Sequence, residues 1–147
     1  MADSFIPYLT VADAGAAIAF YQNAFGATEV YRIPMPRPDG STAVGHAELT
    51  LGEARFMLSD EVPDSNVLAP RGSSPVCMHL YVHDVDPLFQ RAVAAGATVL
   101  RPLEDQFHGD RGGKLQDPFG HVWYFATKKE DLSPEEIQRR AAALFGA

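Results

Sequence analysis

The sequence has one cysteine among its 147 residues and no apolar run that approaches the length of a membrane span. The lone thiol, Cys77, can form neither an intrachain disulfide nor, without partners, a thiolate zinc site, so we interpret it as a small buried apolar residue. A bilayer-spanning helix needs roughly 20 consecutive apolar residues. The first residues also lack the basic and apolar segments of a secretory signal. We therefore expect a cytoplasmic protein with no membrane partner.

Basic residues are few and are not clustered. The chain carries 12 Lys and Arg against 19 Asp and Glu, which gives a formal net charge of −7. No basic patch is available for a phosphate backbone, so we expect no nucleic acid partner. The sequence also lacks a Gly-x-Ser-x-Gly motif, and no spacing predicts a Ser/His/Asp triad. Both absences argue against a covalent hydrolase.

The chain does contain an internal repeat. Residues 9–13 (LTVAD) match residues 80–84 (LYVHD), and the tripeptide Gly-Ala-Thr closes a helical pattern at 26–28 and again at 96–98. The offset between the copies is 71 residues at the start and 70 at the end. Because two copies fill most of the chain, we expect one domain, residues 1–147, made of two modules at about 4–62 and 75–128.

Each repeat begins with a strand followed by a helix. In the first copy Asp13 is the predicted N-cap and Gly26 the helix stop. In the second copy Asp86 is the predicted N-cap, Pro87 occupies the first helical position, and Gly96 is the stop. The apolar stripes have helical spacing and consist of Ile18, Tyr21 and Phe25 in the first copy and Leu88, Phe89, Ala92 and Val93 in the second. Both copies therefore read strand–helix.

Three shorter strand-like stretches follow each helix. They lie at 28–33, 46–51 and 55–58 in the first copy, and at 98–102, near 114–116 and at 121–127 in the second, after opening strands at 5–11 and 76–82. Loops are expected at 34–41, 63–75 and 107–113. A capping box with proline at the first helical position opens a further amphipathic helix at about 133–146. These patterns predict an α+β fold of two βαβββ modules with an extra C-terminal helix.

The duplicated unit resembles the vicinal oxygen chelate superfamily, which includes glyoxalase I, bleomycin- and fosfomycin-resistance proteins and extradiol dioxygenases. The resemblance lies in Phe20-Tyr21-x-x-Ala24-Phe25-Gly26-Ala27 of the first copy and in Asp117-Pro118-Phe119-Gly120-His121-x-Trp123 of the second. Residues 46–49 (HAEL) and the end of the chain look most like its PhnB-like branch. The resemblance implies a half-barrel, formed by the glyoxalase/bleomycin-resistance-type modules, whose concave face holds a ligand, and a homodimer.

Alternation along the strands assigns side chains to the two faces of each sheet. We expect Phe5, Leu9 and Val11 to pack on the helix, and Trp123 to do the same from the last strand. Arg111, in the glycine-rich loop at 107–114, is expected at a mobile rim of the pocket. The predicted ligand-binding residues are Tyr8, His46, Glu48, Met57, Cys77, His79, Tyr81, Arg111 and Tyr124. Together they describe an aromatic pocket with a few polar groups.

The usual metal centre of the superfamily is not expected. Matching the repeats to the metal-dependent members places their four ligands at Ile6, Met57, Cys77 and Tyr124, of which three are not ordinary ligands of a hard metal. The alternative is a relocated divalent metal ion. His46, Glu48 and His79 have the composition of a facial triad at cavity-facing positions.

Three functions remain open. The first is a binding protein, of the kind that confers antibiotic resistance, which holds an aromatic or amphipathic small molecule and needs no cofactor. The second is a metal-dependent lyase, isomerase or dioxygenase that uses the relocated site. The third is a structural partner protein that associates through the C-terminal helix. The residues assign no catalytic group.

Overall fold

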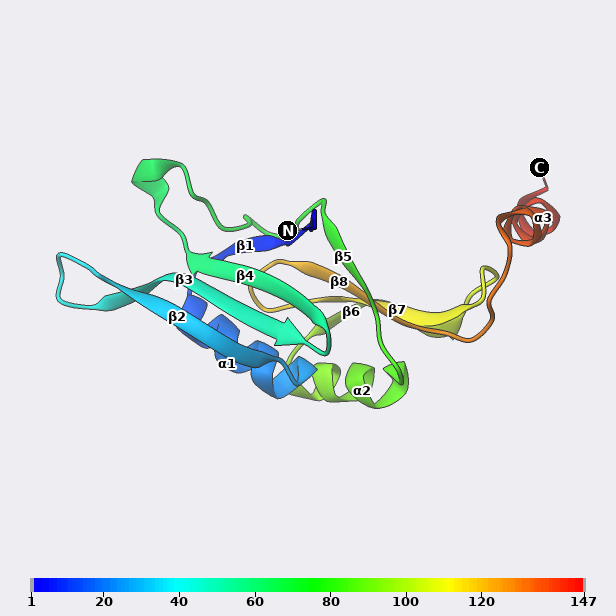
Figure 1. Cartoon of the computed structure of the whole chain (residues 1–147), viewed down its shortest axis with the longest axis horizontal. Helices are drawn as coiled ribbons and strands as arrows, with labels where there is room; N and C mark the ends of the chain where they lie inside the picture. Colours follow the sequence, from blue (N-terminus) through cyan, green and yellow to red (C-terminus); the bar gives the residue numbers. More distant parts are fainter. Residues whose placement is uncertain (1, 147) are drawn as a thin grey trace.

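The computed structural model describes residues 2–146 and contains two mixed four-stranded sheets, two helices that pack on them, and a third helix at the end of the chain (Figure 1). The elements are β1 (Tyr8–Val11), α1 (Ala14–Phe25), β2 (Thr28–Pro36), β3 (Thr42–Leu51), β4 (Ala54–Asp60), a 3-10 turn (Pro63–Ser65), β5 (Cys77–Tyr81), α2 (Val85–Ala95), β6 (Thr98–Asp105), β7 (Asp110–Gln116), β8 (Val122–Lys128) and α3 (Pro134–Phe145).

The two sheets have the same topology. Their strand orders are β1-β4-β3-β2 and β5-β8-β7-β6, and in each sheet the first and last strands of the module run parallel while the other neighbours run antiparallel. Both α1 and α2 cover the same side of the sheets, which leaves the opposite side open (Figure 1). The predicted fold class, two βαβββ modules with an added C-terminal helix, is confirmed.

Helix α1 begins and ends at the predicted residues. The Asp13 side chain accepts a hydrogen bond from the amide of Ala16 at 3.0 Å, and Gly26 takes the left-handed conformation (φ 72°) that ends the helix. The predicted apolar stripe of α1 is buried. Local sequence signals therefore define this helix completely.

The N-terminus of α2 differs from the prediction. The helix begins at Val85 with Asp84 at the N-cap, so Asp86 lies in the first turn and is not the cap. The side chain of Asp84 makes no capping bond. Instead the Val85 amide donates to Oγ1 of Thr127 at 2.8 Å. A residue from β8 thus supplies the acceptor, which the local sequence could not reveal.

The two modules share one core, and a buried carboxylate joins them. Asp117 accepts hydrogen bonds from the Tyr21 hydroxyl at 2.6 Å, from Nε1 of Trp123 at 2.9 Å, and from the amides of Phe119 and His121. Tyr21 belongs to the first module and the other four residues to the second. Since buried polar groups are costly unless they are paired, this network fixes the modules relative to one another.

Several predicted boundaries are wrong. Strand β2 extends to Pro36 and β3 begins at Thr42, so the loop expected at 34–41 is shorter, and β6 extends to Asp105. The first strand starts at Tyr8, and the Phe5 side chain is 97% exposed, so it does not pack on α1 as predicted. The predicted loop at 107–113 is shorter, because β7 already begins at Asp110. Gly112 and Gly113 are strand residues, and each lies against a bulky ring: an added Cβ would lie 2.5 Å from the Tyr124 hydroxyl and 2.5 Å from the Phe89 ring, respectively.

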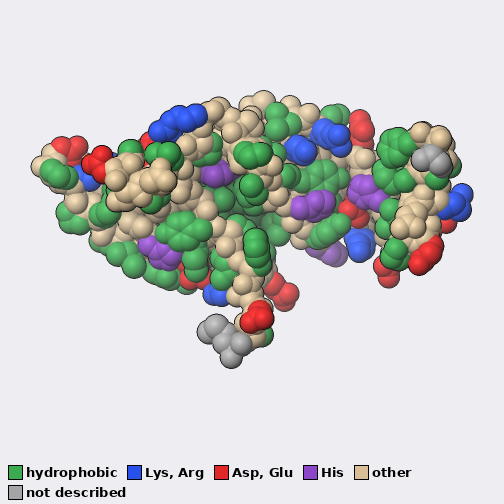
Figure 2. Space-filling view, turned by 90° about the horizontal axis from the view of Figure 1, so that it is seen from above, with side chains coloured by type: hydrophobic (Ala, Val, Ile, Leu, Met, Phe, Trp, Pro, Cys, Tyr) green, Lys and Arg blue, Asp and Glu red, His purple; other side chains and the backbone are tan. Residues whose placement is uncertain are grey.

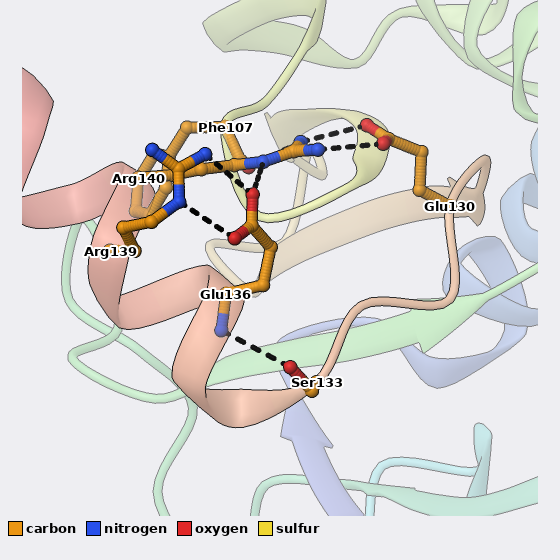
Figure 3. Close-up of polar contacts among 6 residues, drawn as sticks. All are labelled: Phe107, Glu130, Ser133, Glu136, Arg139 and Arg140. Atoms are coloured by element: carbon orange, nitrogen blue, oxygen red, sulfur yellow. Dashed lines mark hydrogen bonds and ion pairs between the residues drawn. The ribbon is translucent and has the colours of Figure 1, made fainter.

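Helix α3 lies away from the body of the protein, beyond the end of the second sheet (Figure 1). Ser133 accepts from the amide of Glu136 as the capping box predicts, but the Glu136 carboxylate binds Arg139 and Arg140 (Figure 3). Arg140 also binds the carboxylate of Glu130 through two bonds of 2.9 Å and the carbonyl of Phe107. An ion-pair network therefore holds this helix. None of the helices among residues 2–146 is long and apolar enough to cross a membrane.

Candidate ligand-binding site

A cavity of about 810 Å³ lies between the two modules. Residues 4–9 form one wall with the β3–β4 turn, and residues from 76 to 80 form the other, with Trp123 also in contact. Most of the lining is apolar, with Ile6, Pro7, Leu9, Leu51, Phe56, Val76, Met78 and Leu80 among its members. Of the predicted ligand-binding residues, Tyr8, Cys77 and His79 line it. This volume is within the range of small-molecule sites.

On the open face of the first sheet, His46 lies between two tyrosines. Its Nδ1 is 2.8 Å from the Tyr8 hydroxyl and its Nε2 is 3.0 Å from the Tyr31 hydroxyl. A neutral imidazole has one donor and one acceptor nitrogen, so one phenol donates to the ring and the other accepts from it. The two bonds hold the His46 ring in place. Both phenols remain about half exposed, at 49% and 43%.

Glu48 and Met57 lie beside this group. They are paired across β3 and β4, and Met57 is paired with Tyr8 across β4 and β1. The Glu48 carboxylate forms an ion pair of 3.1 Å with Arg55. The negative charge of the first sheet is therefore neutralised within its own module.

The open face of the second sheet carries His79, Tyr81 and Tyr124. The ring centroid of His79 lies 5.1 Å from that of Tyr81 and 4.5 Å from that of Tyr124. The Tyr81 hydroxyl donates to the buried carboxylate of Asp110 at 2.8 Å, and Nδ1 of His108 is 3.4 Å from the same carboxylate. Tyr124 is only 8% exposed, because its ring lies over Gly112.

Four side chains near the open face of the second sheet have pKa values that are shifted in the direction that favours the neutral form. Desolvation lowers the pKa of His79 and raises the pKa of Tyr124. The hydrogen bond to Asp110 is the main cause that raises the pKa of Tyr81. Desolvation also raises the pKa of the Cys77 thiol, although the charge of Lys114 opposes that shift. The face thus offers aromatic surface, neutral donors and a protonated thiol.

Two predicted residues have surroundings that differ from the expectation. Cys77 is exposed and lines the cavity, so the interpretation as a buried apolar residue is wrong. Arg111 lies on β7 and not on a mobile loop: it binds the carboxylate of Asp86 through three contacts of 3.0 to 3.3 Å and contacts Asp105. These bonds hold its guanidinium at the N-terminus of α2, away from the cavity lining.

The residues at the family's metal positions do not fit a divalent ion. Ile6 has no donor atom, Met57 offers only a thioether, and Cys77 and Tyr124 supply one thiol and one phenol, so the set contains no imidazole and no carboxylate. The alternative set is not brought together either. No group of three His, Cys, Asp or Glu side chains within residues 2–146 is arranged to hold a metal. His46 and Glu48 are held by Tyr31, Tyr8 and Arg55 in the first module, and His79 lies in the second.

Sequence reasoning did not predict the partners of two of the site residues: Tyr31, which bonds to His46, and Asp110, which bonds to Tyr81. Tyr31 follows a register shift in the β2–β3 ladder, between Glu29 and itself, so simple alternation gives it no reliable face. Asp110 was assigned to a loop. The one available signal was the length of the strong strand at 121–127. A partner strand that pairs along its whole length must begin near Asp110, which lies opposite Lys128.

Comparison with known proteins places the chain in a family. A sequence profile described as "Glyoxalase/Bleomycin resistance protein/Dioxygenase superfamily" matches residues 4–125. The uncharacterized protein Rv0887c of Mycobacterium tuberculosis is 45% identical over 137 residues, which cover 90% of this chain and 78% of that protein.

Two solved structures have a similar fold. The crystal structure of TioX from Micromonospora sp. ML1 has a TM-score of 0.67 at 28% identity and covers 86% of this chain and 99% of that one. The X-ray structure of the Arabidopsis thaliana At5g48480 gene product has a TM-score of 0.64 at 30% identity, with coverage of 86% and 99%. On this evidence the chain belongs to the glyoxalase/bleomycin resistance protein/dioxygenase superfamily.

Proposed function

We propose that this protein is a PhnB-like member of the superfamily that binds a flat aromatic or amphipathic small molecule and requires no metal centre. The observation that carries the proposal is the cavity of about 810 Å³ between the modules, with its apolar lining and the polar tips of Tyr8 and His79 at its wall. Such a site buries the rings of a ligand and orients it with few hydrogen bonds. Sequestration of an aromatic antibiotic or metabolite requires no more.

The first experiment is a fluorescence titration with N-phenyl-1-naphthylamine, a neutral flat probe. We expect its emission to rise on binding and the emission of Trp123 to change, because that ring contacts the cavity and is the single tryptophan of the chain. Tyr8→Ala removes an aromatic wall and should weaken binding about fivefold, the scale of one aromatic contact. Bleomycin, as a competitor, tests the resistance function.

Tyr31→Ala is the matched control for Tyr8→Ala. Both tyrosines bond to His46 and both are about half exposed, but only Tyr8 lines the cavity. The control should bind the probe as the wild type does. If the wild type does not bind the probe, or if the two variants lose the same affinity, the assignment of the site to this cavity is wrong.

A homodimer is the assembly that we propose for this site. The edge strands β2 and β6 expose the apolar side chains of Val30, Ile33, Val99 and Leu100, and α3 exposes Leu144 and Phe145. A second copy is the occupant that would cover both sets of residues symmetrically. Light scattering should give twice the chain mass. Removal of residues 133–147 should leave the mass unchanged if the sheets carry the interface and halve it if α3 does; a monomeric full-length chain would contradict the proposal.

A further inference from the structure

One row of four side chains crosses the open face of the second sheet. Cross-strand pairing joins His79 of β5 to Tyr124 of β8, Tyr124 to Lys114 of β7, and Lys114 to Arg101 of β6. Residues that are directly opposite in a sheet point to the same face, so the four side chains form a continuous strip. Electrostatic effects on neighbouring groups are consistent with this placement. The charge of Arg101 acts to lower the pKa of Tyr124, and the charge of Lys114 acts to lower the pKa of Cys77.

The two cations of this row have no partner. Arg101, Lys114, Lys128 and Lys129 form neither an ion pair nor a side-chain hydrogen bond with the residues from 2 to 146. The other Lys and Arg residues all do so. This is notable in a chain with seven more acidic than basic residues. Figure 2 shows Lys or Arg and His side chains gathered on the half of this face that is nearer to α3.

Lys114 and Arg101 are also placed at a cost. Like charges that are directly opposite across two strands repel one another, and neither cation forms an ion pair with residues 2–146. The carboxylate nearest in register, Glu104, is paired with Gly112 and forms no ion pair with either cation. His79 and Tyr124 add no charge near neutral pH, because desolvation lowers the pKa of the first and raises that of the second. The strip therefore carries two positive charges without an ion pair, and the acidic group that acts on its other two members, Asp110, is bonded to Tyr81 and lies beside His108.

The backbone is adapted at this place. The β6–β7 ladder shifts register on both sides of Arg101, between Val99 and Arg101 and again between Arg101 and Glu104. Bulges of this kind redirect a side chain and are common beside functional sites. One row along β7, Gly112 leaves the space that the Tyr124 ring occupies. The result is a cationic strip with an aromatic floor.

We propose that Arg101 and Lys114 bind an anionic group, a carboxylate, sulfonate or phosphate, of a ligand whose aromatic part reaches the cavity at His79. A guanidinium and an ammonium on adjacent strands supply several donors to one oxyanion, and charge-assisted bonds of this kind are the strong ones. The proposal rests on the proposed function for the aromatic part of the ligand. The anion site can be tested separately from it.

A matched pair of probes separates the two parts. 1-Anilinonaphthalene-8-sulfonate has the ring system of N-phenyl-1-naphthylamine with an added sulfonate. The wild type should bind the sulfonate probe about tenfold more tightly than the neutral one, the scale of hydrogen bonds to a charged group. The double variant Arg101→Gln/Lys114→Gln should lose this preference and keep its affinity for the neutral probe. Lys129→Gln removes an unpaired cation that lies off the row and should behave as the wild type does.

Inorganic phosphate tests the anion site without any aromatic group. Phosphate should raise the melting temperature of the wild type more than sodium chloride does at the same ionic strength, and the double variant should respond equally to both salts. Failure of both dyes to bind contradicts the proposed function and leaves this result as the test of the strip. A double variant that keeps the sulfonate preference, or a wild type that responds equally to phosphate and chloride, overturns the inference.

Discussion

The two modules place different chemistry on the same scaffold. The row Tyr8–Met57–Glu48–Tyr31 of the first sheet occupies the position that the row His79–Tyr124–Lys114–Arg101 occupies in the second. In the first row the single carboxylate is neutralised by Arg55, whereas in the second row two cations remain without a partner. The two modules share strand order and the pairing of these rows, and they differ in the side chains on their open faces.

The comparison extends to the position beside each row. His46 of β3 corresponds to Gly112 of β7, since each lies two residues before the charged member of its row. In the first module an imidazole fills the place and is held by two phenols. In the second the place is empty of side chain, and Tyr124 covers it. One module therefore presents a polar group and the other presents an aromatic surface.

The largest expected effect comes from Asp117, the buried carboxylate that joins the two modules. Asp117→Ala leaves the Tyr21 hydroxyl, the Trp123 indole and two amides without their acceptor, so the free energy of unfolding in urea should fall by roughly 3–5 kcal/mol. Asp39→Ala is the control, because that carboxylate bonds only within an exposed turn. A loss below about 1 kcal/mol for Asp117→Ala would refute this role.

Gly112→Ala tests the difference between the two open faces. The new methyl group would lie 2.5 Å from the Tyr124 hydroxyl, so the ring must move, and we expect a loss of about 1–3 kcal/mol in the free energy of unfolding. The same substitution in a Tyr124→Ala background should cost less than half as much, because the conflicting ring is gone. Equal costs in the two backgrounds would show that the strain lies in the backbone and not in the packing of Tyr124.

This glycine also shows where sequence reasoning reaches its limit. Repeats, caps and alternation are local signals, and they predicted the two βαβββ modules and the limits of α1. Gly112 looked like part of a flexible loop, because its reason, the ring of a residue from the next strand, is a tertiary contact. The cap of α2 was missed for the same kind of reason: its acceptor is Thr127.

The sequence also could not predict the register in which neighbouring strands pair. A strand pattern assigns faces correctly only while the ladder is regular, and both β2 and β6 contain shifts. Tyr31 and Arg101 follow such shifts at equivalent places of the two modules, and neither entered the predicted site. The predicted residues that line the cavity, Tyr8, Cys77 and His79, all lie on the regular strands β1 and β5.

Helix α3 differs from the two modules because it has no buried residues and is stabilised by ion pairs. Hydrogen bonds from Arg139 and Arg140 lower the pKa of Glu136 to about 2. A carboxylate with a depressed pKa in the folded state stabilises that state above its ordinary pKa, and this contribution disappears as the pH falls towards 2. Carbon chemical shifts of residues 134–145 should therefore lose helical character between about pH 4.5 and 2, while those of α1 persist.

Two glutamine variants control this experiment. Glu136→Gln should show reduced helical character of residues 134–145 already at pH 7, because its two ion pairs within α3 are gone. Glu135→Gln removes a neighbouring carboxylate that forms no ion pair with residues 2–146, and it should titrate as the wild type does. If α3 and α1 lose helical character at the same pH in every variant, the ion-pair network does not hold the helix.

The smallest expected effect is a change in the pKa of Cys77, which measures the positive charge on the open face of the second sheet most directly. Desolvation raises the pKa of the Cys77 thiol and the positive charge of Lys114 opposes it, so Lys114→Gln should raise that pKa further. The rate of alkylation by iodoacetamide follows the thiolate fraction, and its midpoint in a titration from pH 7 to 11 measures the shift. Arg32→Gln removes a cation of the first module that does not line the cavity and should leave the midpoint unchanged. A midpoint that does not respond to Lys114→Gln would place the ammonium too far from Cys77 to share its face. The two rows would then differ in sequence without a difference in electrostatic potential at Cys77.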